Sequence, residues 1–596
     1  MWSSTMRDRL LIRHFLRRFL EHDLISPNAD RHIVLSVIAG TLVAVSLFVV
    51  VFIASPYQFF PLMPPGIVSR RSLDERFFFV SVSMVVLALV AVAQWDALSL
   101  DARDTAALGV LPIPRAVIVR TKFIAVALLA IGAALAWNFV PTVLRFVVIP
   151  PKLGVSFRGA LALTLAHGVT TFTAGAFGFL TVMGLREVLV AILGPAWFRR
   201  ISAVLQATLL VALVTALLLL PGIPMGTTGH WLAQGGLTSR ALPPFWFVGL
   251  HERLVGDVID GLPRTQPERM LVAAERNATD LYRRVRPRYD ELAPMAIAAL
   301  VFVGGVTGAA CLWNCRRLPM PVVRRAHKDG VAGGAWKWMV THVVARTSLR
   351  QAGFFFTLQA LSRQGPHRIA LASAVAVGLS LVLITAQGQV LVPGDDGRGV
   401  ASLPLALLAG QWLLLGSVLS GFRHTVRIPA ELRASTTFSL AWAGHLSPCM
   451  SGVKRAGWIA LVLPTLGGLF IWHAVVLGAR LAALHLGVGL LVSALLMDTL
   501  FVRYRRLAFV NGYVPSVELK SRGVAYVGTL LLVSFTLAWI ERFAFAAPPR
   551  YLFLVAATLT LNAGMRAFDS RSRWPTVPLD LEEPPGSTIQ RLDLAS

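Results

Sequence analysis

The sequence predicts an all-α membrane protein, a polytopic transmembrane helical bundle of about twelve spans in two six-helix halves. Apolar residues make up 56% of the 596-residue chain and charged residues only 14%, so a soluble core of this size would leave too little polar surface. The chain contains about twelve apolar runs, and the length of each is close to the roughly 20 residues that a helix needs to cross hydrocarbon. A basic segment at 316–368 separates the sixth run from the seventh.

The apolar runs define the predicted organisation of the chain. They start near Ile33, Phe77, Phe123, Gly159, Ile201 and Met295 in the first half, and near Ile369, Ser402, Gly457, Leu481, Ala525 and Tyr551 in the second. We expect an N-terminal interfacial helix at 1–32, a first half at 33–315 with an external helical loop at about 222–294, a basic cytoplasmic linker at 316–368, a second half at 369–566 and a cytoplasmic tail at 567–596.

The distribution of positive charge predicts the orientation. The chain has 56 Lys and Arg against 30 Asp and Glu. Most of these cations fall in the terminal segments and in alternate connections between the runs, a bias typical of cytoplasmic loops. We therefore expect both termini in the cytoplasm and anionic lipids as partners of the basic surfaces. We expect no nucleic-acid partner, because membrane orientation already explains the charge.

The N-terminal arm predicts a helix that lies at the membrane surface. Its charges are spread along it and no small-residue cleavage site follows, so it is not a signal peptide. Apolar residues recur at helical spacing on one side of this helix, and basic residues occupy the other side. The apolar residues are Ile12, Phe15, Leu16, Phe19 and Leu20, and the basic residues are Arg9, Arg13 and Arg17. Such a helix can be a simple anchor or a mechanical part of a transporter.

The connection between the second and third runs, Trp95–Lys122, predicts a short helix at the cytoplasmic surface. Asp101 is placed to cap it and Asp104 to complement its dipole. Gly109 can close the helix, and Pro112 prevents it from continuing.

Here the sequence resembles a known family. The run from Leu100 to Arg115, with the pattern Leu-Asp-x-Arg-Asp-x-x-x-Leu-Gly-x-Leu-Pro-Ile-Pro-Arg, is similar to the cytoplasmic loop of bacterial ATP-binding-cassette (ABC) permeases of the type-2 exporter class, and to a group of long permease-like proteins within it. Further similar pieces are Pro243–Leu250, Arg350–Gln359, Ile428–Ala434, Gly452–Ala456 and Arg506–Pro515. The stretch Ser435–Leu440 departs from the family by lacking its aromatic and charged pattern.

The resemblance implies a transport permease in a bacterial inner membrane. Type-2 exporters place a coupling helix between the second and third spans of each half, where it touches an ATPase subunit. In this chain Trp95–Lys122 and Phe422–Ala456 take those places. The implied ATPase-coupling residues are Asp101, Arg103, Asp104, Pro112 and Arg115 in the first segment, and Glu431, Arg433, Lys454 and Arg455 in the second.

The chain lacks the motif of an ATPase of its own. A Gly-x-x-x-x-Gly-Lys-Ser/Thr loop is absent, and the nearest approach, Gly330–Lys337, has the wrong spacing. We therefore expect separate ABC ATPase subunits as partners, with ATP used by them and no cofactor bound by this chain. Three cysteines, Cys311, Cys315 and Cys449, have no His or Asp cluster beside them, so we predict neither a metal site nor a catalytic residue.

Two alternatives remain open at this stage. An ion-coupled secondary transporter usually keeps a carboxylate inside its spans. We find no Asp or Glu well inside any run, and Asp498 is at a cytoplasmic end; the intramembrane polar groups are Gln206, Gln411, His167, His473 and His485. An intramembrane transferase would need these histidines to meet an acid, which only clustering in space could provide.

The external loop holds the largest group of acids beside arginines. These acids are Glu252, Asp257, Asp260, Glu268, Glu275, Asp280, Asp290 and Glu291. Their spacing favours amphipathic helices resting on the outer leaflet with solvated charges, rather than a catalytic carboxylate pair.

The sequence and the resemblance together predict an ABC-type permease, which the resemblance implies is an exporter. The apolar spans favour a lipid-like or amphipathic cargo.

Overall fold

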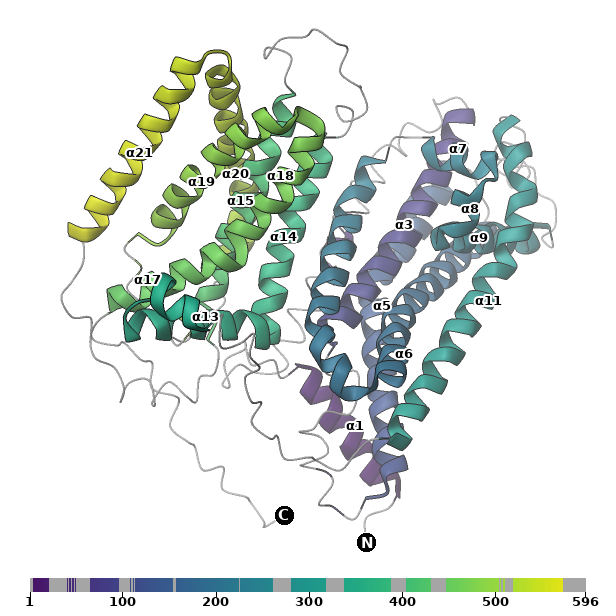
Figure 1. Cartoon of the computed structure of the whole chain (residues 1–596). Coiled ribbons are helices and arrows are strands. Elements are labelled where there is room, and N and C mark those ends of the chain that lie inside the picture. Colours follow the sequence, from purple (N-terminus) through teal and green to yellow (C-terminus); the bar gives the residue numbers. More distant parts are fainter. Residues whose placement is uncertain are drawn as a thin grey trace. The chain divides into compact units, whose positions relative to one another are not determined.

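The computed structural model describes residues 4–20, 65–95, 113–153, 157–223, 226–260, 280–317, 337–386, 404–429, 446–502 and 518–571, with isolated positions between them. Every regular element within these ranges is a helix (Figure 1). The predicted all-α class is confirmed.

Eleven helices in the described part of the chain are long and apolar enough to cross a membrane. They are Leu73–Ala93, Ala116–Val143, Phe157–Phe198, Arg200–Gly222, Pro287–Arg316, Gly365–Ala386, Leu405–Val426, Leu446–Leu477, Ala479–Leu500, Ala525–Phe545 and Pro548–Asp569. Each lies at one of the predicted runs. The remaining run, near Ile33, falls mostly outside the described residues.

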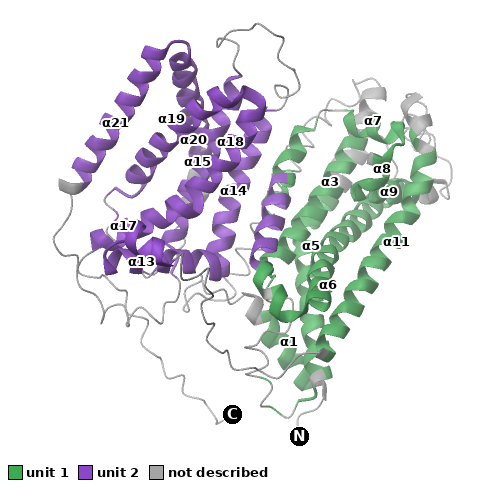
Figure 2. Cartoon of the chain, viewed as in Figure 1, with its two compact units in different colours: residues 1–22, 29–202, 216–323 green, residues 23–28, 203–215, 324–596 purple. Residues whose placement is uncertain are grey.

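The chain divides into two compact units (Figure 2). Unit 1 contains Met1–His22, Ala29–Ser202 and Ala216–Val323; unit 2 contains Asp23–Asn28, Ala203–Thr215 and Arg324–Ser596.

Unit 1 is built from one amphipathic helix, long spans and a group of short helices. The elements are α1 (Ser4–Leu20), α3 (Pro65–Ala93), α5 (Arg115–Leu153), α6 (Phe157–Leu219), a single turn at Leu220–Gly222, α7 (Thr227–Gln234), α8 (Leu237–Ala241), α9 (Pro243–Asp260) and α11 (Asp280–Arg317). The stretch Ala203–Thr215 of α6 belongs to unit 2. Two predicted spans are merged in α6. They meet at Gly194, whose φ of 74° only glycine adopts readily, and Pro195 follows it.

In the predicted external loop, the short helices α7 and α9 pack on the protein core with their apolar sides. Phe245, Phe247 and Val248 of α9 are completely buried and belong to the core that α3 and α11 share. Asp74 of α3 holds the start of α7, because its carboxylate accepts hydrogen bonds from the Gly226 N–H at 2.6 Å and from the Thr228 hydroxyl. Amphipathic spacing predicted the apolar side of these helices correctly, but that side contacts protein.

The main part of unit 2, Arg324–Ser596, begins inside the predicted basic linker, whose described part is mostly helical. A π-helical turn at Val340–Val344 precedes α13 (Ser348–Arg363). The remaining helices are α14 (Gly365–Ala386), α15 (Leu405–Val426), α17 (Leu446–Gly457), a π-helical turn at Trp458–Val462, α18 (Leu463–Leu477), α19 (Ala479–Leu500), α20 (Glu518–Phe545) and α21 (Pro548–Arg571). Within unit 2, α13 and α17 lie together at one end of the bundle (Figure 1). The central helix is α15, most of whose side chains are buried.

Candidate functional site

Most of the predicted coupling residues lie outside the described residues. These are Asp101, Arg103, Asp104 and Pro112 of the first segment and Glu431 and Arg433 of the second. Arg115 is the first residue of α5, and Lys454 and Arg455 lie in the last turn of α17. The structure therefore places the end of each predicted coupling segment at the start of the third span of its half.

Lys454 and Arg455 bind other elements of unit 2. The Lys454 ammonium lies 3.0 Å from an Asp498 carboxylate oxygen of α19, and the other oxygen lies 3.3 Å from Arg566 Nε of α21. The Arg455 guanidinium donates to the Val344 carbonyl, just before α13. Both cations therefore fix α17 to its neighbours, and a partner at this surface would meet an ordered helix.

Two glycines bring α13 and α17 into close contact. A Cβ atom at Gly353 would overlap the Cys449 carbonyl group, and one at Gly452 would overlap the Arg350 carbonyl. Phe354, next to this crossing, is completely buried. Backbones can approach this closely only where side chains are absent, so the crossing depends on glycine at both positions.

A similar pairing occurs in unit 1 between α1 and the start of α5. Asp8 forms an ion pair with Arg120, and the Lys122 ammonium lies 4.8 Å from the centre of the Phe15 ring. Phe15, on the predicted apolar face of α1, is completely buried, while Arg9 on the other side is exposed. Part of the predicted interfacial face therefore packs on protein, which ties α1 to the third span.

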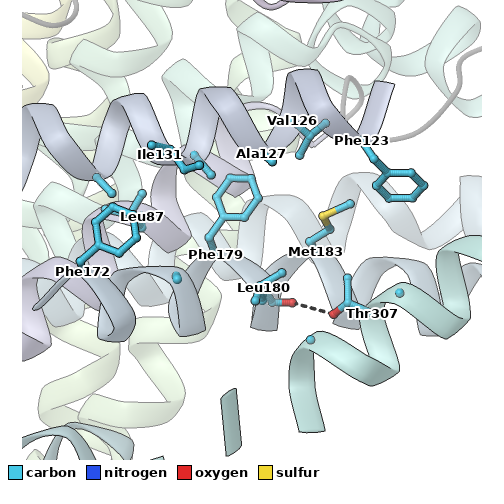
Figure 3. Close-up of a pocket in the computed structure, with 15 residues that line it drawn as sticks. Leu87, Phe123, Val126, Ala127, Ile131, Phe172, Phe179, Leu180, Met183 and Thr307 are labelled. Carbon is cyan, nitrogen blue, oxygen red and sulfur yellow. Dashed lines mark hydrogen bonds between the residues drawn. The ribbon is translucent and has the colours of Figure 1, made fainter. Parts of the chain in front are cut away.

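An apolar cavity of about 290 Å³ lies among the spans of unit 1. Helices α3, α5, α6 and α11 line it with side chains that include Leu87, Ile131, Phe179 and Met183 (Figure 3). Its one hydroxyl group, on Thr307, lies 2.7 Å from the Val303 carbonyl oxygen and 3.2 Å from the Leu180 carbonyl oxygen. Since that hydroxyl is already engaged, the cavity suits hydrocarbon better than a polar ligand.

A buried polar cluster in unit 2 contains a carboxylate that lies within a span, near its end, although the sequence predicts no Asp or Glu well inside any run. Glu541 is in the span Ala525–Phe545 and is 1% exposed. Its Oε1 atom lies 2.6 Å from His485 Nδ1 of α19. The His473 ring of α18 meets the His485 ring edge to face at 4.8 Å, and the Trp412 ring of α15 does so at 5.8 Å. Two of the scattered intramembrane histidines and an acid therefore cluster in space.

A second buried cluster, in unit 1, corrects the solvated-charge interpretation for Glu252. This carboxylate of α9 forms an ion pair with Arg76 of α3, and both side chains are largely buried. His251 Nδ1 lies 3.6 Å from Glu252 Oε1, and the His167 ring of α6 lies 6.3 Å from the His251 ring. Glu291, by contrast, is partly exposed and pairs with Arg240 and Arg288.

Glu187 is a further carboxylate that sequence reasoning missed. It lies in α6 within the span Phe157–Phe198, and its partners are Arg186 and the side-chain amide of Asn314, the latter at 2.8 Å. Both Glu187 and Glu541 stand beside an arginine in the sequence. A charged pair at the end of an apolar run resembles the start of a loop, so hydropathy placed both glutamates outside the spans.

The fold defines the chain as a multi-pass α-helical membrane protein. No family model, curated protein or solved structure matches it.

Proposed function

We propose that the chain is the membrane-spanning permease subunit of an ABC-type exporter in a bacterial inner membrane, driven by separate ATPase subunits. One observation carries the proposal. In each unit a helix that precedes the described spans packs against the start of a span that the sequence predicts to be the third of its half, as α1 on α5 and α13 on α17. The two predicted coupling segments, Trp95–Lys122 and Phe422–Ala456, end at these helix pairs.

This arrangement suits the transmission of force. Ion pairs and close glycine contacts join each surface helix to a span, so a push on the coupling segment moves a packed unit rather than a free loop. Closure of the ATPase subunits would then shift the spans and alternate the access of cargo to either side. The apolar cavity of unit 1 supports a lipid-like or amphipathic cargo.

Purification from the native membrane tests the partner. The isolated chain should hydrolyse no ATP, and a separate nucleotide-binding subunit should co-purify with it and restore hydrolysis. ATPase activity of the chain alone would contradict the proposal, and so would repeated native purification without such a subunit.

The His485–Glu541 pair favours a second candidate, an ion-coupled secondary transporter, because intramembrane carboxylates commonly lie on ion pathways. Transport into sealed vesicles separates the two candidates. An exporter needs ATP and its ATPase, whereas a carrier concentrates cargo when an ion gradient alone is imposed.

A further inference from the structure

Buried carboxylates of the described residues differ in how their charge is balanced. Glu187 pairs with Arg186 and Glu252 with Arg76, and the partly buried Asp498 lies beside both Lys454 and Arg566. Arginine and lysine carry a permanent charge near neutral pH, so none of these carboxylates needs a further proton to balance its charge. Glu541 pairs with a histidine instead.

The His485–Glu541 pair is neutral only if it binds a proton. A neutral imidazole beside an ionised carboxylate leaves a net negative charge, and both side chains are at most 1% exposed. An unbalanced charge at such a site, within the spans Ala479–Leu500 and Ala525–Phe545, is strongly unfavourable. One added proton, whether it makes His485 cationic or Glu541 a neutral acid, removes that charge.

The groups around the pair do not replace this proton. His473 and Trp412 contact it through their rings, and Gln411 donates to the His485 backbone carbonyl at 3.0 Å. The Tyr551 hydroxyl of α21 donates to the Leu484 carbonyl. Within the described part of the chain, the ion-pair partner of Glu541 is His485, at 2.6 Å.

We propose that His485 and Glu541 form a proton-binding site that holds one exchangeable proton while the side-chain contact between α19 and α20 is in place. A movement that separates α19 from α20 breaks the 2.6 Å contact and exposes both groups to water, so proton release accompanies it. The site is independent of the proposed permease function, since it can accompany either energy source.

Reversible unfolding of the full chain in mixed detergent micelles, from about pH 5 to about pH 8, tests the proton count. Unfolded Glu and His titrate near their ordinary pKa values of about 4.3 and 6.5. In the native wild type the His485–Glu541 pair keeps one proton, whereas in the native Glu541→Gln variant these two positions keep none. The ratio of wild-type to Glu541→Gln folding constants should therefore fall about tenfold per pH unit across the whole range.

His485→Gln gives a second, different profile. Glu541 then has to stay protonated by itself, so the native state still holds one proton, while the unfolded variant loses its proton above about pH 4.3. The ratio of wild-type to His485→Gln folding constants should rise about tenfold per pH unit up to about pH 6.5 and then become flat. The two profiles are separable even if one variant folds poorly.

Glu187→Gln is the matched control, because Arg186 already balances that carboxylate. It should change stability by the same factor at every pH. A flat ratio for Glu541→Gln would show that the pair binds no additional proton and would overturn the proposal.

Discussion

Lys454 of α17 and Asp498 of α19 form an ion pair across 3.0 Å, with their side chains 19% and 17% exposed. The resemblance to ABC permeases implies that Lys454 contacts an ATPase subunit, but this pair also gives it a role in holding α17. A change at Lys454 will therefore alter stability as well as partner binding.

A double-mutant cycle measures that role. Lys454→Met and Asp498→Asn should each lower the free energy of unfolding by about 1–3 kcal/mol, because each leaves a half-buried charge without its partner. The double variant should cost clearly less than the sum of the two. Arg566→Gln is the control, since that side chain is 68% exposed and should cost no more than about 0.5 kcal/mol. Additive single effects would show that the pair contributes nothing to stability.

The α13–α17 crossing gives a second prediction. Gly353→Ala places a methyl group against the Cys449 carbonyl, so it should lower the free energy of unfolding by about 1–3 kcal/mol. Gly467→Ala in α18 is the matched control: nothing lies within 4 Å of its added methyl group, and alanine favours the helix by up to about 1 kcal/mol. Unfolding midpoints in detergent compare them, and equal midpoints would mean that the crossing is looser than described.

A third prediction concerns the apolar cavity of unit 1. Gly308 of α11 lines it, and a Cβ there meets open space, so Gly308→Leu should fill part of the 290 Å³ without strain. Binding of an apolar fluorescent probe in nanodiscs should weaken about tenfold, equivalent to about 1.4 kcal/mol. Gly305→Leu, on the same helix with open space but outside the lining, should leave probe binding unchanged. Equal affinities for both variants would place the probe elsewhere.

The spans could be predicted because crossing hydrocarbon depends only on a sufficiently long apolar stretch of local sequence. A helix needs about 20 apolar residues whatever it packs against, so the starts at Phe77, Phe123 or Tyr551 follow from hydropathy alone. The environment of α9 could not be predicted in this way. Its spacing gives an apolar side, but whether lipid or the α3–α11 core covers that side depends on distant elements.

The polar clusters could not be predicted from the sequence for a related reason. His485 and Glu541 are 56 residues apart, and no residue beside His485 marks it as the partner of an acid. Glu541 also lies close to the end of its run, next to Arg542, where averaged hydropathy indicates a loop. The acid reaches the histidines because α18, α19 and α20 all pack against α15. For the coupling segments, the sequence motif stays a prediction, since Asp101 and Glu431 lie outside the described residues.

The orientation of the chain is a fourth prediction. Basic residues concentrate in alternate connections and at both termini, so reporter fusions at Gly330 and at Ser596 should be cytoplasmic and a fusion at Gly261 external. Paired reporters that are active on opposite sides of the membrane provide the measurement. An external signal at Gly330 would reverse both predicted coupling segments to the outer side and exclude an intracellular ATPase partner.

The last prediction concerns ATPase coupling. Arg103→Glu, Arg115→Glu and Glu431→Arg should each leave expression and membrane insertion intact, because a charge change in aqueous surroundings usually alters stability by no more than about 0.5 kcal/mol. At an interface the same change removes an attraction and adds a repulsion, which can cost several kcal/mol of binding. Each variant should therefore capture less ATPase subunit in a pull-down.

Arg158→Glu is the control for these charge reversals. Arg158 is exposed at the start of α6, which follows the end of α5, so it lies at the opposite end of that span from Arg115. In the predicted orientation it carries the same change in charge on the external side, away from an intracellular ATPase, and capture should equal that of the wild type. Unchanged capture by all three test variants, at normal protein levels, would mean that the segments are simple connectors. Reduced capture by the control as well would indicate a general effect of charge rather than a docking surface.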